Sequence, residues 1–355
     1  MESNLAPGRR VYVDHTHLGR HVTGIERITQ ELFCDEALAP VALAPVRSRG
    51  LTSMIFAQNV TLPLKALRDR GALILCPGFP PSFLLSRFGE RVLPYIHDLF
   101  LLTRDQDLNR KARLYMVKPF RHAVKTLPRF LVNSEYTRDS LRAFCRPDAK
   151  IMLYRPAVRN VFSLAPRAQR TRKADELRLV ALGTVEPRKN LLAAAAITGA
   201  LRQKGFVRAR LDILGRFGWG SELEALRALP GVHLHGYQPG EVIRQRVEGA
   251  DLFINTSHDE GLGLPLLEVQ FAGLPVVAPD RAVFREVLGD SGVLIDPDDP
   301  GASAEKIKGL VQRGGWRAKS AAAAENNLAR WNMAAAADRA AFIAFLLSHE
   351  QGGVA

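Results

Sequence analysis

The second half of the chain alternates short apolar runs with amphipathic stretches, and this alternation limits its possible folds more than any other feature. Strands that are apolar throughout and joined by helices are typical of a parallel sheet covered on both faces. The pattern therefore predicts a doubly wound α/β domain. The expected strands are 177–182, 210–214, 232–234, 251–256, 275–278 and 293–295, with helices at 191–202, 222–229, 239–248 and from about 265.

The first half repeats this style more loosely, and 355 residues suit two domains, each with its own core. We predict a Rossmann-like N-terminal domain at 1–160, a linker at 161–176, a second such domain at 177–330 and a C-terminal helix at 331–355 that packs back toward the first domain. A site is expected in the interdomain cleft. The expected first-half strands are 11–14, 40–46, 72–76, 92–97, 130–133 and 151–153, with helices at 25–36, 108–127 and 137–144.

The formal net charge of +13 favours an anionic partner: nucleic acid, acidic lipid or a phosphorylated substrate. No RNP or zinc-finger pattern appears, so nucleic acid is not expected. Cys34, Cys76 and Cys145 lack metal-ligand spacing and are expected to be buried thiols of a reducing compartment. The beginning of the sequence lacks the apolar stretch of a secretory signal, and the apolar run 191–201 is too short to cross a bilayer. A cytoplasmic protein is expected.

The sharpest local signal is the stretch SHDEGLGLPLLE at 257–268, which directly follows a predicted buried strand. Gly261 and Gly263 permit a tight turn, and Pro265 suits a helix start. The unpaired N–H groups at such a helix start attract an anion such as a diphosphate. Glu260 precedes the helix and Glu268 is expected in its first turn, so both carboxylates can accept hydrogen bonds from sugar hydroxyls. The helix dipole alone also favours an acid at the position of Glu268.

Several motifs then occur in the order found in one enzyme family. They are TGIER at 23–27, YIHD at 95–98, VNSEYTR at 132–138, LGTVEPRKN at 182–190, EGLGLPLLE at 260–268, AGLPVVAPD at 272–280 and GDSGVLIDPDDP at 289–300. Together they resemble the family 4 retaining glycosyltransferases, whose Glu-x7-Glu motif matches 260–268 and whose fold is GT-B. The resemblance is strongest to bacterial polysaccharide and lipopolysaccharide mannosyltransferases.

The resemblance implies roles for residues of the second domain. Glu268 would hold the donor ribose, while Glu260 with Gly261, Leu262, Gly263 and Leu264 would hold the donor hexose. Lys189 would bind the diphosphate. Thr184 stands where the family commonly has an arginine, and Arg188 could supply that missing cation. A solvated helix start is the alternative explanation for Arg188 and Lys189.

In the first domain, the resemblance implies that His97 approaches the donor sugar from the acceptor side, although a lone histidine is often structural. Thr23 and Gly24 could approach the donor through backbone N–H groups, or simply cap a helix. Catalysis with retention would need positioning and positive potential, with no protein nucleophile, no metal and no other cofactor. The carboxylates in 296–299 are expected to serve a turn and an N-cap instead.

The donor would be GDP-mannose or a UDP-sugar, and the acceptor a saccharide or a lipid-linked saccharide. Residues 108–134 carry seven Lys or Arg residues and no acid, with apolar residues at helical spacing. Such a helix can bind an anionic membrane surface, here the inner face of the cytoplasmic membrane, or it can be a crossover helix with a solvated basic face.

Other enzymes remain as alternatives. A sugar phosphorylase or a nucleotide-sugar epimerase can use the same fold. A dinucleotide oxidoreductase is more distant, because the glycine-rich run 214–220 lacks G-x-G-x-x-G spacing.

Overall fold

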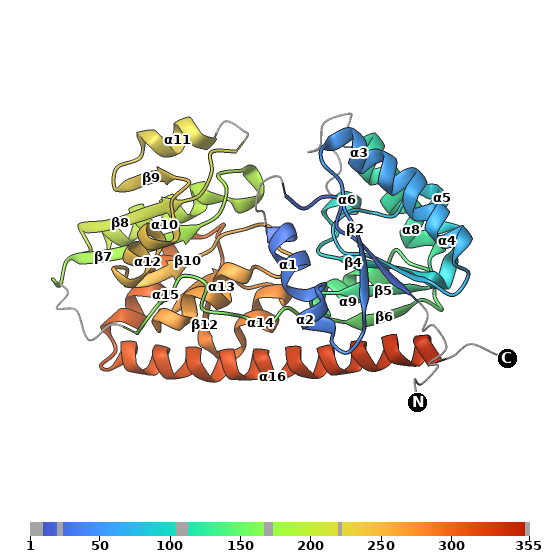
Figure 1. The fold of residues 1–355 in the computed structure, drawn as a ribbon. Coiled ribbons are helices and arrows are strands. Elements are labelled where there is room, and N and C mark those ends of the chain that lie inside the picture. Colours follow the sequence, from blue (N-terminus) through green and yellow to red (C-terminus); the bar gives the residue numbers. More distant parts are fainter. Residues whose placement is uncertain (1–9, 20–23, 104–112, 167–172, 219–221, 352–355) are drawn as a thin grey trace. The chain divides into compact units, whose positions relative to one another are not determined.

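The computed structural model describes residues 10–19, 24–103, 113–166, 173–218 and 222–351 (Figure 1). The chain divides into two compact units. The first comprises Met1–Pro156 and Ala334–Ala355, and the second comprises Ala157–Met333. Within the described residues, no helix is both long and apolar enough to cross a bilayer.

The first unit is built on a six-stranded parallel sheet in the order β2-β1-β3-β4-β5-β6. The chain thus places β2 on one side of β1, and then adds β3 to β6 one after another on the other side. Every residue of strand 92–96 is buried, including Tyr95, so this strand is covered on both faces of the sheet. The strands are β1 Val11–Asp14, β2 Leu43–Val46, β3 Leu73–Cys76, β4 Val92–Ile96, β5 Arg129–Val132 and β6 Lys150–Leu153.

The helices of the first unit cover both faces of this sheet. On one face, α4 Leu62–Arg68, α5 Phe83–Ser86 and α8 Lys118–Thr126 enclose a core with Ile74 and Phe130. The remaining elements are α1 Gly24–Leu32, α2 Asp35–Leu38, α3 Leu51–Phe56, the π-helical turns η1 Ala57–Thr61 and η4 Arg113–Val117, the short α6 Phe100–Thr103, and α9 Glu135–Arg142.

The second unit has a six-stranded parallel sheet in the order β12-β11-β10-β7-β8-β9. The chain starts in the middle at β7, winds out to β9, and returns to start again at β10. The strands are β7 Glu176–Leu182, β8 Arg208–Leu214, β9 Val232–Gly236, β10 Leu252–Ile254, β11 Val276–Pro279 and β12 Gly292–Ile295. The helices are α10 Leu191–Gln203, α11 Glu222–Ala228, α12 Gly240–Glu248, α13 Leu264–Glu268, α14 Ala282–Leu288 and α15 Pro300–Gln312.

The predicted two α/β domains are confirmed. Every predicted strand is present, with ends that differ by a few residues. The predicted helix 25–36 is divided into α1 and α2, and the continuous helical segment from α3 through η1 to α4 was not predicted. The boundary of the units falls before the predicted linker 161–176, and Leu164, within that range, is buried.

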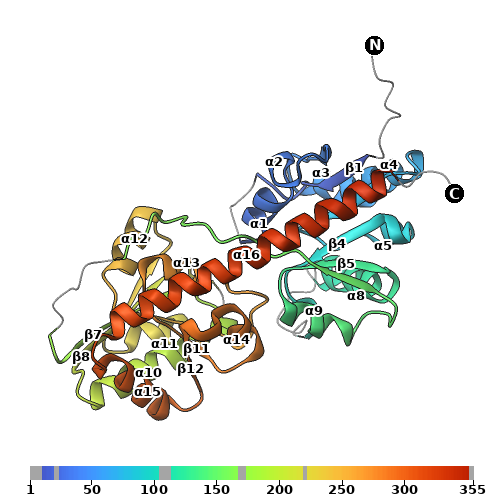
Figure 2. The same cartoon turned by 90° about the horizontal axis from the view of Figure 1, so that it is seen from below.

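The helix α16 runs without interruption over Trp316–Gln351 and contributes to both units (Figure 2). In the second unit, buried Asn327 donates to the Gln270 side chain and to the Val287 carbonyl. In the first unit, Phe342 is fully buried and packs edge-on against Phe33. The single long helix thus contributes buried residues to the cores of both units.

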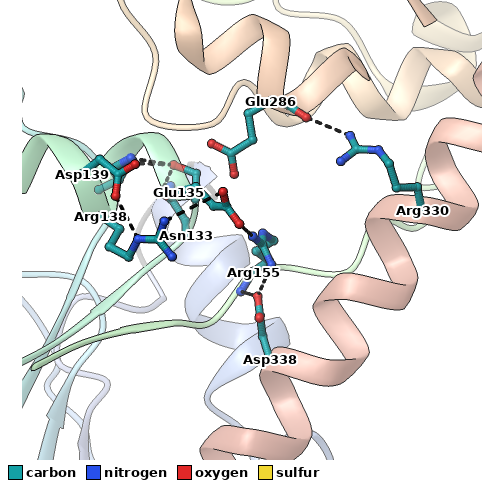
Figure 3. A network of polar contacts seen from close by, with 10 residues as sticks. Asn133, Glu135, Arg138, Asp139, Arg155, Glu286, Arg330 and Asp338 are labelled. Atoms are coloured by element: carbon teal, nitrogen blue, oxygen red, sulfur yellow. Dashed lines mark hydrogen bonds and ion pairs between the residues drawn. The ribbon is translucent and has the colours of Figure 1, made fainter. Parts of the chain in front are cut away.

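Arg155 holds the last part of α16 in the first unit (Figure 3). Its guanidinium donates to the Asp338 carboxylate at 2.9 Å and to the Glu135 carboxylate at 2.9 Å. Both Arg155 and Asp338 are largely buried, with side chains 9% and 13% exposed. Burial raises the pKa of Asp338 even against the opposing charge of Arg155. Arg155 therefore supplies the hydrogen bonds and the charge that water would otherwise supply to a carboxylate on the buried face of the helix.

Replacing Arg155 by alanine should destabilise the first unit, because Asp338 then remains buried without its cation. Loss of one partner of a buried pair costs about 3–5 kcal/mol. We expect a lower denaturant midpoint, and a smaller loss when the pH is lowered enough to protonate Asp338. The double variant Arg155→Ala/Asp338→Asn should recover part of the loss. Arg146→Ala, which removes an exposed pair with Asp148 outside this network, is the control. Equal effects of Arg155→Ala and the control would contradict this role.

Candidate functional site

The candidate site lies at the carboxyl ends of β7 and β10, which are neighbours in the second sheet. Strand order reverses between these two strands, and α/β sheets bind ligands outside the carboxyl ends of strands at such a reversal. Two loops meet there. The loop after β7 covers 183–190, and the loop after β10 covers 255–263. Sequence reasoning placed most of its second-domain candidates on these loops, and the sheet order brings them together.

Hydrogen bonds join the two loops closely. The His258 backbone N–H donates to the Arg188 carbonyl at 2.9 Å, and the Thr256 hydroxyl donates to the Asn190 carbonyl at 2.7 Å. The Arg188 guanidinium donates in turn to the Asp259 carbonyl. The loops therefore form one unit, which fixes the charged side chains that they carry.

Glu260 is the centre of the charged cluster. Its side chain is only 8% exposed, and it lies 2.5 Å from the Lys189 ammonium and 3.1 Å from the Arg188 guanidinium. Ser257 donates its hydroxyl to the same carboxylate. Arg188 also pairs with the buried Glu186. The predicted alternative of a solvated helix start for Arg188 and Lys189 is wrong, because both cations lie in a largely buried ion-pair network.

The cluster keeps Glu260 ionised. Burial alone would raise the pKa of this carboxyl, but the charges of Lys189 and Arg188, with hydrogen bonds from Lys189 and Ser257, hold it below its ordinary value. An ionised carboxylate accepts hydrogen bonds and cannot donate a proton. Glu260 is therefore suited to hold hydroxyl groups and is not suited to act as a general acid.

Glycines let the backbone approach closely beside this cluster. Gly183 has φ +143°, and the Lys189 side chain crosses at 3.3 Å from where its Cβ would stand. A Cβ on Gly215 would overlap the Gly183 carbonyl. The Thr184 methyl group lies close to Gly218. Gly215 and Gly218 therefore serve the packing of one loop on another. This packing role is an argument against the alternative that 214–220 binds a dinucleotide.

The helix after the glycine turn differs from the prediction. Gly263, at φ +76°, caps α13, so the helix begins at Leu264 and Pro265 is its second residue. Glu268 is consequently the last residue of a five-residue helix and not a residue of its first turn. It is 3% exposed. The dipole explanation for Glu268 therefore fails, since that effect is confined to the first turn. Gly261 and Leu262 are buried, whereas Gly263 and Leu264 are partly exposed.

His97 belongs to the first unit and follows β4, as predicted. It lies beyond the carboxyl end of that strand, where its Nε2–H donates to the Pro77 carbonyl at 2.6 Å. Burial lowers the pKa of His97 to about 4, although this hydrogen bond opposes the shift. The imidazole is therefore neutral near pH 7, and its Nδ1 is the nitrogen that can accept a hydrogen bond.

The structure gives different outcomes for the remaining candidate residues. Gly24 is the exposed first residue of α1, whereas Thr23 lies outside the described residues. Asp299 caps α15 through the Ala302 N–H, and Asp296 accepts from the Asp298 N–H, so the predicted turn and N-cap are confirmed. No group of three or more His, Cys, Asp or Glu residues in the described part of the chain is arranged to hold a metal ion.

Sequence reasoning missed several residues around the cluster. Glu186 and Ser257 bind the charged side chains directly, and both stand inside motifs that were recognised for other residues. Exposed aromatic residues follow the next two strands: Phe217 after β8 and Tyr237 after β9, with the Arg216 guanidinium 5.2 Å from the Tyr237 ring centre. Their position at consecutive strand ends is the signal that could have found them.

Comparison with known sequences finds glycosyltransferases. Residues 176–313 match the model of the glycosyl transferases group 1 family. Over 249 residues, the chain is 27% identical to O-antigen chain mannosyltransferase B of Escherichia coli, which covers 67% of this chain and 65% of the relative. It is 32% identical over 225 residues to a D-inositol 3-phosphate glycosyltransferase of Thermobispora bispora, covering 58% and 52%. The chain thus spans less than two thirds of these relatives.

Solved structures confirm the fold. Sucrose-phosphate synthase from Thermosynechococcus elongatus matches with a TM-score of 0.71 at 15% identity, over 96% of this chain and 99% of that one. WaaG, a glycosyltransferase involved in lipopolysaccharide biosynthesis, matches with 0.66 at 13% identity, over 97% and 100%. HepE of Anabaena, solved with UDP and glucose, matches with 0.63 at 14% identity, over 92% and 98%. The architecture is GT-B, and the domain match together with the named relatives supports a transferase.

Glu260→Gln should flatten the dependence of stability on pH. Because the folded pKa of Glu260 is depressed, its carboxylate contributes stability above the unfolded pKa, about 4.3, and this contribution is lost as pH falls through the folded pKa. We expect the variant to have a lower melting temperature at pH 7, with the gap to the wild type narrowing between about pH 5 and pH 3. Glu325→Gln, at an exposed position on α16, is the control. A gap that stays constant over this range would contradict the assignment.

Proposed function

We propose that this chain is a family 4 retaining glycosyltransferase. It would move a hexose, with mannose as first choice, from a nucleotide-sugar to a saccharide or lipid-linked acceptor of bacterial surface polysaccharide. The buried cluster of Arg188, Lys189 and Glu260 at the β7/β10 reversal carries the proposal, because it sets two cations and a hydroxyl-binding carboxylate side by side. The relative named O-antigen chain mannosyltransferase B supports mannose and this pathway class.

The donor would be held by its charge pattern. Lys189 has three N–H donors and Arg188 has five, so both can bind phosphate oxygens while keeping Glu260. Glu260 would accept from hexose hydroxyls, and Glu268, as the second acid of the Glu-x7-Glu motif, would accept from the ribose. Phe217 and Tyr237 follow the neighbouring strands and would flank the base. GDP-mannose is the first choice of donor, and a UDP-sugar is the second, since HepE was solved with UDP.

The chemistry would rest on positioning and positive potential. Arg188 and Lys189 would stabilise the leaving diphosphate, which would help to take the acceptor proton as attack occurs on the same face of the sugar. No metal ion or other cofactor has a part in this scheme. Neutral His97 would accept a hydrogen bond from the sugar through Nδ1, and backbone N–H groups at Thr23 and Gly24 would approach the donor. The enzyme would work in the cytoplasm, at the inner face of the membrane.

A panel of UDP-, GDP- and dTDP-sugars tests the function. A donor at 100 times its dissociation constant should stabilise the protein by about 2.7 kcal/mol, and this is seen as a rise in melting temperature. The responding donor is then incubated alone and with saccharide acceptors. Transfer should require an acceptor, whereas an epimerase converts the donor alone and a phosphorylase needs phosphate. A panel without any response would contradict the proposal.

Glu268→Ala should weaken donor binding. Loss of charge-assisted hydrogen bonds to the ribose should cost about 1.5–3 kcal/mol, or about 10- to 150-fold in the dissociation constant. Isothermal titration with the responding donor measures the change, and Glu325→Ala on the exposed side of α16 is the matched control. A folded Glu268→Ala protein with unchanged donor affinity would refute the ribose role.

A further inference from the structure

The segments α3, η1 and α4 of the first unit form one continuous helix over residues 51–68 (Figure 1). Its inner side is ordinary: Met54, Ala57, Leu62 and Ala66 are buried, and the last three belong to the core of the unit. The outer side of such a surface helix is normally polar. In this helix, large apolar side chains stand among the exposed polar residues Thr52, Ser53 and Asn59.

The outer side of this helix carries large apolar side chains. Phe56, Leu64 and Leu67 repeat at helical spacing and are 60%, 41% and 62% exposed, and Leu51 and Ile55 add 60% and 38%. The π-helical turn η1 inserts its wider turn between the two α-helical parts, which keeps Phe56 and Leu64 aligned on the outside. A helix with large apolar side chains on its outer as well as its inner side is expected to contact a second apolar phase.

The short helix α5 enlarges the same surface. It contacts α4 and η1 on one side and α8 on the other. Its Phe83 and Leu84 are 50% and 48% exposed, and the Phe83 ring packs against His122 of α8. Seven of the fifteen exposed large hydrophobic residues of the described chain therefore lie on two neighbouring helical segments. Scattered apolar residues need no explanation, but a cluster marks an interaction surface.

Basic residues border this apolar cluster. On α8, Lys118, Arg121 and Lys125 are all exposed and recur at helical spacing. Arg68 ends the long helix, and Arg87 follows α5, both also exposed. Neither helix 51–68 nor α5 nor α8 contains an acidic residue. An apolar patch bordered by these cations complements a surface that is apolar below and anionic above.

We propose that this face of the first unit docks on an anionic lipid bilayer. Phe56, Leu67, Phe83 and Leu84 would enter the interface between headgroups and acyl chains, and the cations of α8 would contact the headgroups. Helix 51–68 and α5 would insert into the bilayer, whereas α8 would supply only positive charge. A second copy of the chain does not suit this face, because two such surfaces would bring like charges together. The inference rests on the proposed function only for the membrane location, to which it assigns a surface, and it needs no nucleotide-sugar chemistry.

Vesicle co-sedimentation without nucleotide tests the proposal. We compare phosphatidylcholine vesicles with and without phosphatidylglycerol, using the wild type, Phe56→Ser/Leu67→Ser, Lys118→Ala/Lys125→Ala and the control Val207→Ser. Val207 is 56% exposed in the second unit. The wild type and the control should bind anionic vesicles, and less so as salt rises. The apolar double variant should bind about 10-fold or more weakly, and the lysine double variant should lose most of the preference for anionic lipid.

Results of two kinds would overturn the proposal. One is vesicle binding of the apolar variant equal to that of the wild type, or no binding of the wild type at all. The other is a concentration-dependent dimer, seen by light scattering, that the Phe56→Ser/Leu67→Ser changes abolish. Circular dichroism and the donor response of the second unit check that the variants are folded. Because vesicle binding is measured without donor, its failure leaves the glycosyltransferase proposal standing, and failure of the donor panel leaves the membrane surface standing.

Discussion

The ion pairs between Glu260 and the two cations of the preceding loop are the interaction on which the rest of the site depends. A buried carboxylate without partners would take up a proton, and buried cations without partners would be costly. Here each group makes the ionised state of the others tolerable. The pairs also join the loop after β7 to the loop after β10, so that the charges of the site and its shape have the same origin. Truncating any one member would disturb both.

The position of this cluster follows from the topology of the second sheet. Strands β7 and β10 are far apart in the sequence, but they become neighbours because the chain returns to the middle of the sheet after β9. In open α/β sheets, ligands bind outside the carboxyl ends of strands at such a reversal. The same reversal occurs between β1 and β3 in the first unit. The chain thus contains two places that its folding pattern prepares for ligands, and the Glu260 cluster lies at the second of them.

Much of the fold could be predicted from the sequence, because buried parallel strands are apolar along their whole length. The helix at 51–68 could not, because it has apolar residues on two sides and its π-helical turn interrupts the usual period, so no amphipathic pattern stands out. The site was predictable as a motif but less so as geometry. Glu268 was predicted in the first turn of its helix, but it lies one residue beyond that turn because Gly263 caps the helix and Leu264 begins it. The contacts of Glu186 and Ser257 depend on a loop conformation that no spacing reveals.

Thr184 stands where the resembling family commonly has an arginine, and it packs on the loop after β8. The methyl group of Thr184 lies against Gly218, on the loop that extends the β7–β8 pairing through the Val185 hydrogen bonds. The Arg188 guanidinium reaches Glu260 from the same loop, so this loop carries a cation beside the cluster without a basic residue at 184. Positive charge can therefore be supplied from either end of a short loop, provided that its backbone is fixed. The fixed element here is the close contact of Gly183 with Gly215, so the glycines determine where the cations can be.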